Sequence, residues 1–322
     1  MWKYCGKKII ETLIVMLLIS FFSFAIIYIA PGDISSMYIT AYMSEAEREA
    51  VLEKLGANKS LPEQYLGWLE KAVHGDFGVS LSNKASVAPQ LMRRLPTTIL
   101  LMGCALLLSL LLAIPLGLWA GYKKNGIVDN VISFISYIGM SIPSFWLGML
   151  LIILFTAKLR ILPSGGMHTV GKESLLDTIQ HLIMPSLTLS LGTLATFIRY
   201  IRTNTIGQLA EEYVLNAEAK GTTAPNILRK HVLKNTLLPI ITLLGMNLAS
   251  LVCGSFIIES VFGWPGIGMF AMSAIGQRDY PIIMAYIMLS GFILVMGNLL
   301  ADILYAFADP RIKRGIDRAN GK

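Results

Sequence analysis

Apolar residues in this chain form long runs instead of the alternating patterns of soluble helices and strands. The runs cover residues 9–30, 97–121, 131–158, 182–201, 237–258 and 282–307. Each has the roughly 20 residues that an α-helix needs to cross a hydrocarbon layer about 30 Å thick. The pattern predicts an all-α integral membrane protein with about six transmembrane helices.

The composition favours a membrane protein over a soluble or nucleic-acid-binding one. Of the 322 residues, 54% are hydrophobic and 15% are charged, too few charges to cover the surface of a water-soluble domain. The formal net charge is +7, but the lysines and arginines cluster beside the apolar runs, where the positive-inside rule places them. Membrane orientation therefore explains the charge, and we expect lipid and no nucleic acid as a partner.

The basic clusters also predict the topology. Clusters at residues 3–8, 123–124, 199–234 and 311–322 fall on one side of a six-helix arrangement, which is expected to be the cytoplasmic side and to hold both termini. The first run is followed by Pro31-Gly32-Asp33 without a small-residue cleavage site, so we interpret it as a retained anchor helix.

This topology divides the chain into four parts. We expect an N-terminal transmembrane helix at residues 1–30 and an extracytoplasmic segment at 31–96. In that segment the spacings at 43–55 and 63–73 suit amphipathic helices. A core transmembrane domain at 97–308 contains a cytoplasmic loop at 202–236, and a cytoplasmic tail follows at 309–322.

The sequence contains no recognisable catalytic or metal-binding motif. HExxH, GxSxG and the GxxxxGK[ST] phosphate loop are missing. The four histidines, His74, His168, His181 and His231, fall in different loops and helix ends. We therefore predict no catalytic residue, no metal site and no cofactor in this chain, and any ATP-driven process would require a separate ATPase.

A few residues interrupt the apolar runs. Pro143 is expected to kink the third run. Glu259 begins an irregular stretch to Gly268 and is interpreted either as an interfacial side chain or as part of a gate. Polar or amphipathic residues that could line a translocation pathway, or else bond between helices, are Ser141, Ser144, Trp146, Asn247 and Ser250. Pro143 and Glu259 are further candidates for this pathway.

The segment from residue 199 to 239 is far longer than a connection between neighbouring helices needs. Residues 211–220 favour a helix, Gly221 can end it, and Thr222 or Thr223 can cap a second helix over 224–233. The small residues of this predicted helix–turn–helix would let it enter a cleft of another protein. A surface helix pair without a partner is the alternative.

This segment resembles the coupling loop of bacterial ABC-importer permeases of the dipeptide, oligopeptide and nickel family. The matching residues are Tyr213, Ala217, Ala219, Lys220, Gly221, His231, Asn235, Leu238 and Pro239. Further family landmarks follow in the family's order at 31–33, 143–148, 162–166, 259–268 and 309–311. Together they resemble the first, or B-type, permease subunit.

The resemblance implies a type I importer fold in the bacterial inner membrane. Implied partners are a second permease in a heterodimer, two cytoplasmic ATPases that bind ATP and Mg, and an extracytoplasmic solute-binding protein. ATPase coupling falls to Tyr213, Ala217, Glu218, Ala219, Lys220, Gly221 and Thr222. Phe262, Trp264, Pro265 and Gly266 would face the binding protein.

The implied function is peptide uptake by alternating access. An importer of nickel or a metal chelate with the same architecture is the first alternative. An ion-coupled secondary transporter or channel is an alternative of a different class, but it would leave the long cytoplasmic loop without a role and usually needs buried charges.

Overall fold

The computed structural model describes residues 2–29, 43–47, 49, 59–172 and 174–308. Within these ranges, the side chains of residues 2–5, 7, 238–239, 241–242, 245–254 and 301–308 are not described. The described chain is about 80% helical and contains no strand, so the prediction of an all-α membrane protein is confirmed.

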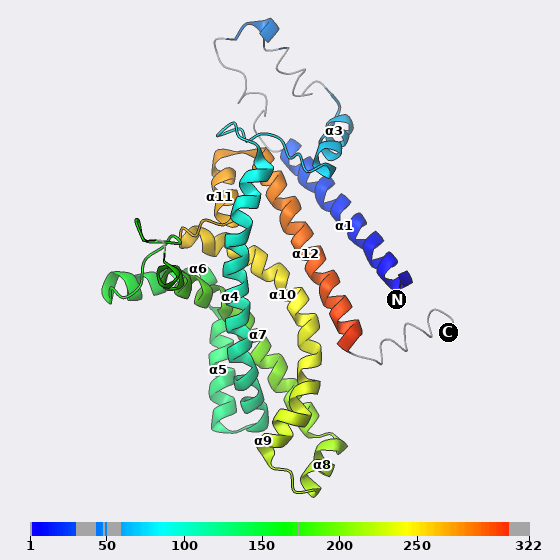
Figure 1. Ribbon diagram of the computed structural model, residues 1–322, viewed down its shortest axis with the longest axis vertical. Helices are drawn as coiled ribbons and strands as arrows, with labels where there is room; N and C mark the ends of the chain where they lie inside the picture. Colours follow the sequence, from blue (N-terminus) through cyan, green and yellow to red (C-terminus); the bar gives the residue numbers. More distant parts are fainter. Residues whose placement is uncertain (1, 30–42, 48, 50–58, 173, 309–322) are drawn as a thin grey trace. The chain divides into compact units, whose positions relative to one another are not determined.

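The helices follow one another along the chain as labelled in Figure 1. They are α1 (Trp2–Ile29), α3 (Leu61–Val73), α4 (Val87–Tyr122), α5 (Ile127–Ser141), α6 (Ser144–Leu151), the π-helical η2 (Ile152–Lys158), α7 (Leu175–Leu209), α8 (Glu212–Ala219), α9 (Ala224–Ile227), the π-helical η3 (Leu228–Val232), α10 (Leu233–Val261), α11 (Ile267–Gln277) and α12 (Tyr280–Ala308).

Four helices in the described part of the chain are long and apolar enough to cross a membrane, and a bent pair raises this number to five. The four are Lys8–Ile29 in α1, α4, α7 and Tyr280–Leu300 in α12. The fifth predicted span, residues 237–258, falls in α10, a continuous helix of 29 residues whose central side chains are not described.

The third predicted span differs from the expected kinked helix. It consists of α5 and the α6–η2 helix, which meet at an angle of 100°. Pro143 has no N–H to continue the helix, and Ile142 before it is extended with ψ 123°. A single proline kink does not predict so large a bend.

Several helices extend beyond their predicted spans. The expected boundary at residues 96/97 falls inside α4, and α7 begins seven residues before the predicted start at 182. As a result Asp129 and Asp177 lie in the first turns of α5 and α7, and Arg202 lies within α7. The helices therefore include charged residues that lie outside the predicted apolar runs.

The chain forms two compact units. One comprises residues 96–269 together with the chain from 293 onward, and the other comprises residues 2–95 and 270–292. Helices α4, α11 and α12 each continue from one unit into the other.

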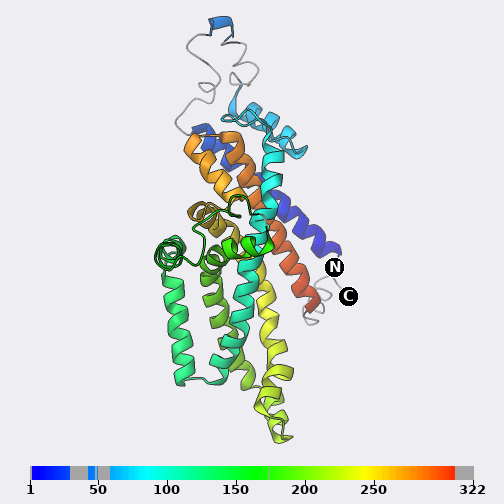
Figure 2. The same cartoon turned by 60° about the vertical axis from the view of Figure 1, so that its left-hand side comes forward.

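In the larger unit, α5, α7 and α10 run side by side (Figures 1 and 2). One core cluster, which includes Leu101, Met184 and Trp264, joins α4, α7 and the residues after α10. A second cluster, which includes Ala113, Phe197 and Ile201, joins α4, α5, α7 and α10. The apolar faces of these helices therefore pack on each other around α7.

In the smaller unit, α3 packs on α1. Tyr65 OH lies 2.8 Å from Ser20 Oγ, and its ring meets Phe21 and Phe24 edge to face. At the start of α3, Ser60 and Glu63 form the reciprocal bonds of a capping box. The amphipathic helix predicted over 63–73 is thus confirmed, whereas most of the one predicted over 43–55 lies outside the described residues.

Candidate functional site

The helix–turn–helix predicted over residues 211–233 is present as a short hairpin of α8 and α9. Gly221 ends the first helix with φ +76°, a conformation that favours glycine, and its N–H donates to Glu218 O at 2.8 Å. Thr223 has the extended conformation of an N-cap before α9. The second helix then continues through η3 into α10, so the hairpin is rooted in two long helices.

The hairpin has its own small apolar core. Val214 and Ala217 of α8 are buried against Ile227 and Val232, and Leu118 of α4 packs on this cluster. The Tyr213 hydroxyl also donates to Gln208 Oε1 at the end of α7, at 2.7 Å. The hairpin is therefore fixed to the ends of α4 and α7.

The residues predicted to contact an ATPase divide into two groups. Glu218, Ala219, Lys220 and Gly221 are exposed at the tip of the hairpin. Ala217 points inward with 8% exposure, and Tyr213 and Thr222 are half-buried. The side chains of Ala217 and Tyr213 and the bond from Thr222 N–H to Ala217 O hold the hairpin together, and the tip offers the exposed surface.

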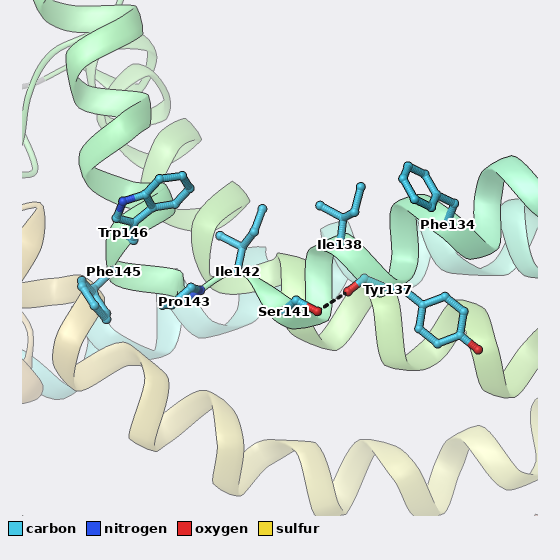
Figure 3. Close-up of a pocket in the computed structure, with 8 residues that line it drawn as sticks. All are labelled: Phe134, Tyr137, Ile138, Ser141, Ile142, Pro143, Phe145 and Trp146. Atoms are coloured by element: carbon cyan, nitrogen blue, oxygen red, sulfur yellow. Dashed lines mark hydrogen bonds between the residues drawn. The ribbon is translucent and has the colours of Figure 1, made fainter.

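A second site lies at the bend between α5 and α6, where a groove of about 510 Å³ is lined by Phe134, Tyr137, Ile138, Ser141, Ile142, Pro143, Phe145 and Trp146. Figure 3 shows Phe134, Ile138 and Ile142 along one side of α5, with Trp146 beyond the break. The structure thus brings together three predicted pathway residues, Ser141, Pro143 and Trp146. The Ser141 hydroxyl donates to Tyr137 O at 2.9 Å, within its own helix.

The other pathway candidates lie elsewhere. Ser144 is half-buried in the first turn of α6 and does not line the groove. Asn247 and Ser250 belong to α10, but their side chains lie outside the described residues. Glu259 has no exposed surface, and it accepts from Thr98 Oγ1 at 2.7 Å and from the N–H groups of Gly268 and Met269 at 2.7 and 3.0 Å.

Most side chains of the loop expected to face a binding protein are buried inside this chain. Phe262 and Trp264 are buried, and Trp264 Nε1 donates to Thr97 O at 3.0 Å. A Cβ at Gly266 would lie 2.4 Å from Glu259 Oε2. Only Pro265 of the four predicted residues is exposed, so it offers the side-chain surface of this loop.

Two histidines are closer together than the sequence predicted. The loop after Gly166 folds back on the first turn of α7, where His168 Nδ1 and His181 Nε2 lie 3.9 and 3.8 Å from Asp177 Oδ2. The Thr169 hydroxyl and N–H also donate to Asp177, both at 2.7 Å. Because Asp177 and His181 are four residues apart on a helix, the sequence alone could have predicted that they share one face. This spacing does not apply to His168 and Thr169, which lie in the preceding loop. No group of three or more His, Cys, Asp or Glu side chains in the described ranges could hold a metal ion.

Sequence reasoning also missed an ion pair between Asp129 of α5 and Arg202 of α7. The signal for it was weak, because the two residues are 73 positions apart and both were placed outside the predicted spans.

These features define a multi-pass membrane protein with a short helical hairpin, and comparison with known proteins identifies its family. Residues 113–314 match the family described as binding-protein-dependent transport system inner membrane component, and residues 1–102 match its N-terminal part. The chain belongs to this family, as an ABC-importer permease of the B type. It is a transport component and not a catalytic subunit.

Similar proteins match along nearly their whole length. The chain is 40% identical over 312 residues to the oligopeptide transport system permease protein AppB of Bacillus subtilis, with 96% of this chain and 99% of that protein covered. It is 33% identical to the probable D,D-dipeptide transport system permease protein DdpB of Escherichia coli, with 98% of each covered. It is 30% identical to the dipeptide transport system permease protein DppB of Escherichia coli, with 92% and 94% covered.

Proposed function

We propose that this chain is one of two permease subunits of an ATP-driven importer of peptides, which moves its substrate by alternating access. The observation that carries the proposal is the α8–α9 hairpin, whose tip from Glu218 to Gly221 is exposed while its base is fixed by an apolar core. Such a projection suits insertion into a groove of another protein.

The proposed partner at the tip is one of two cytoplasmic ATPase subunits, which bind the ATP and Mg. Closure of the ATPases around nucleotide would displace the tip from Glu218 to Gly221. Because the buried residues of the hairpin pack on Leu118 and are linked to α7, a displacement of the tip would carry the ends of these helices with it.

On the opposite side, the proposed partner is an extracytoplasmic solute-binding protein. The segment over 31–96 and the loop at Pro265 are the surfaces proposed for its contact. A second permease would complete the pathway, with the α5–α6 groove and the candidates on α10 facing it. The chain would lie in a bacterial inner membrane with both termini in the cytoplasm.

Peptides are the proposed substrate because oligopeptide and dipeptide systems recur among the names of the similar proteins. Nickel or a metal chelate is the second candidate, because the family landmarks are also those of nickel permeases. A pathway through which a metal passes transiently would need no resident ligand set.

The test is reconstitution of the chain with its permease partner, ATPases and binding protein, comparing radiolabelled dialanine, an oligopeptide and nickel ion. Uptake of peptide that requires ATP would support the proposal. Uptake of nickel alone would overturn the substrate, and uptake without any ATPase would overturn the function.

The same preparation tests the docking role of the hairpin. Gly221→Asp is expected to insert normally but to uncouple ATP hydrolysis from uptake, because it adds bulk and charge to a tip that is open on all sides. Gly221→Asn is the matched control, because it adds the same bulk without the charge. Asparagine also tolerates the positive φ of this position better than most residues. Normal uptake by both variants would reject docking at this position.

A further inference from the structure

The Asp129–Arg202 ion pair links the first turn of α5 to the C-terminal part of α7. The Asp129 side chain is 2% exposed, and both Nε and Nη2 of Arg202 donate to it, the latter at 2.7 Å to Oδ2. The backbone N–H of Asn125 donates to the same carboxylate at 2.8 Å, and the Ser133 hydroxyl donates at 3.2 Å. One carboxylate therefore joins the α4–α5 turn, α5 and α7.

The backbones of α4 and α7 approach closely over the same stretch. A Cβ at Gly117 would lie 2.7 Å from Ile201 Cβ, and a Cβ at Gly121 would lie 2.6 Å from Thr205 Cβ. Residues 201 and 205 flank Arg202 on α7. The ion pair thus lies beside a tightly packed contact between α4 and α7, which leaves these two helices little room to slide past each other.

This stretch also lies next to the root of the hairpin. Helix α7 ends at Leu209 and α8 begins at Glu212, while Leu118, between the two glycines of α4, packs on the hairpin core. In Figures 1 and 2, the α4–α5 turn and the hairpin lie at the same end of the larger unit. At the other end of α5 is the groove at Ser141 and Trp146.

A two-pronged bond of this kind fixes orientation as well as distance, because the planar guanidinium and the carboxylate must stay aligned. A buried ion pair adds little stability compared with a well-packed apolar pair, so register is the property it supplies. Without it, α5 would be held to α7 by apolar packing and by the contacts of Arg199 with Tyr137 and Met140, none of which fixes orientation as a two-pronged bond does.

We propose that Asp129 and Arg202 are positioning residues that make α5 move together with α7 and the hairpin, so that displacement of the hairpin reaches the α5–α6 groove. This inference rests on the proposed docking of the hairpin to an ATPase. The pair transmits the movement and contacts neither nucleotide nor substrate.

The experiment uses the complete reconstituted importer and measures the ATP hydrolysed for each molecule taken up. The probe is radiolabelled dialanine, or nickel ion where the wild type imports only nickel. Lys220→Cys provides a second readout, crosslinking of the hairpin to the ATPase. Asp129→Asn and Arg202→Gln are expected to keep the crosslink and to raise the ATP consumed per molecule by about fivefold or more, the size of a typical coupling between sites.

Arg202→Lys, which keeps the charge but loses the aligned pair of bonds, is expected to give an intermediate ratio. The Asp129→Asn/Arg202→Gln double variant is expected to be no worse than either single variant, because both remove the same interaction. Arg199→Gln is the matched control. Arg199 lies one turn earlier on α7 and also faces α5, with its guanidinium carbon 5.2 Å from the centre of the Tyr137 ring and Nη1 3.6 Å from Met140 Sδ. Its substitution therefore removes a positive charge and contacts between the same two helices without removing a two-pronged bond.

An unchanged ratio in Asp129→Asn and Arg202→Gln would overturn the inference while leaving docking intact. Failure of these variants and of Arg202→Lys to assemble, with Arg199→Gln normal, would also overturn it, because the pair would then serve folding alone. Absence of the crosslink in the wild type would instead refute the proposed docking.

Discussion

Glu259 fixes an irregular stretch of backbone through one buried carboxylate. It accepts from the N–H groups of Gly268 and Met269, while the Thr98 hydroxyl that donates to it also accepts from Ile267 N–H at 2.9 Å. A Cβ at Gly268 would lie 2.5 Å from Phe256 Cα, so the first turn of α11 lies directly against α10. The carboxylate replaces the hydrogen bonds that this backbone would otherwise make with water.

Glu259→Ala is therefore expected to lower the free energy of unfolding by about 3 kcal/mol or more, because it leaves a hydroxyl and two N–H groups buried without their acceptor. Glu259→Gln should cost about 1 kcal/mol, since its amide oxygen can still accept from both N–H groups. Thermal unfolding in detergent measures both. Equal stability of the two variants would contradict the role assigned to the carboxylate.

Asp279, before α12, makes stability depend on acidity. Its Oδ2 accepts from Ser80 Oγ at 2.6 Å and from the hydroxyl and N–H of Ser82 at 2.9 and 3.0 Å. Burial, the largest influence, raises the pKa of this carboxyl, but the hydrogen bonds led by that of Ser80 together lower it below the ordinary 3.8. The ionised form is thus favoured by the folded state.

A carboxyl whose pKa is lowered by folding contributes its stability above the unfolded pKa and loses it as the pH falls through the folded pKa. We expect Asp279→Asn to be less stable than the wild type at pH 7, and the difference to shrink once the pH falls below 3.8. Protease sensitivity of the segment around Ser80, measured against pH, checks this. A difference that grew on acidification would show the opposite sign and exclude the carboxylate as its source.

At the level of whole elements, the hairpin separates residues that hold it together from residues that it presents. Ala217 and Ala219 lie two positions apart on α8, yet the first is buried against Val214 and Ile227 and the second is exposed. The sequence predicted the hairpin correctly because its signals, Gly221 and Thr223, act locally. It could not assign the two alanines to opposite faces, because that assignment depends on Leu118 of a distant helix.

Ala217→Leu is expected to destabilise the hairpin by about 1–3 kcal/mol, because three extra carbons do not fit its core. Ala219→Leu should leave hairpin stability within about 0.5 kcal/mol of the wild type, because it points outward. It should nevertheless reduce uptake if the tip docks in a groove. Hydrogen exchange of residues 211–233 measures the first effect and uptake the second. Faster exchange in Ala219→Leu than in Ala217→Leu would reverse the assignment of faces.

Across the whole molecule, apolar runs predicted the existence of the long helices, because a span of about 20 apolar residues is a property of the sequence alone. The 100° bend at Pro143 was not predictable, since proline permits a break and only packing determines its angle. The Asp129–Arg202 and Ser80–Asp279 contacts were missed for a related reason. Each joins residues far apart in the chain, and no local pattern marks the partner.

The predicted topology places successive loops of the larger unit on alternate sides of the membrane, and this can be tested in the intact protein. The tip at Lys220 is predicted to be cytoplasmic, and the fully exposed Val170, in the loop before α7, is predicted to be extracytoplasmic. Single cysteines at these positions, in a background without Cys5, Cys104 and Cys253, would be probed in whole cells with a thiol reagent that does not cross the membrane. Val170→Cys should react at once and Lys220→Cys only after the cells are opened. The loop at Val170 and the hairpin are connected by α7, a single apolar helix of 35 residues. Labelling of both positions from outside would mean that α7 does not cross the membrane. That result would refute the spans assigned to this unit.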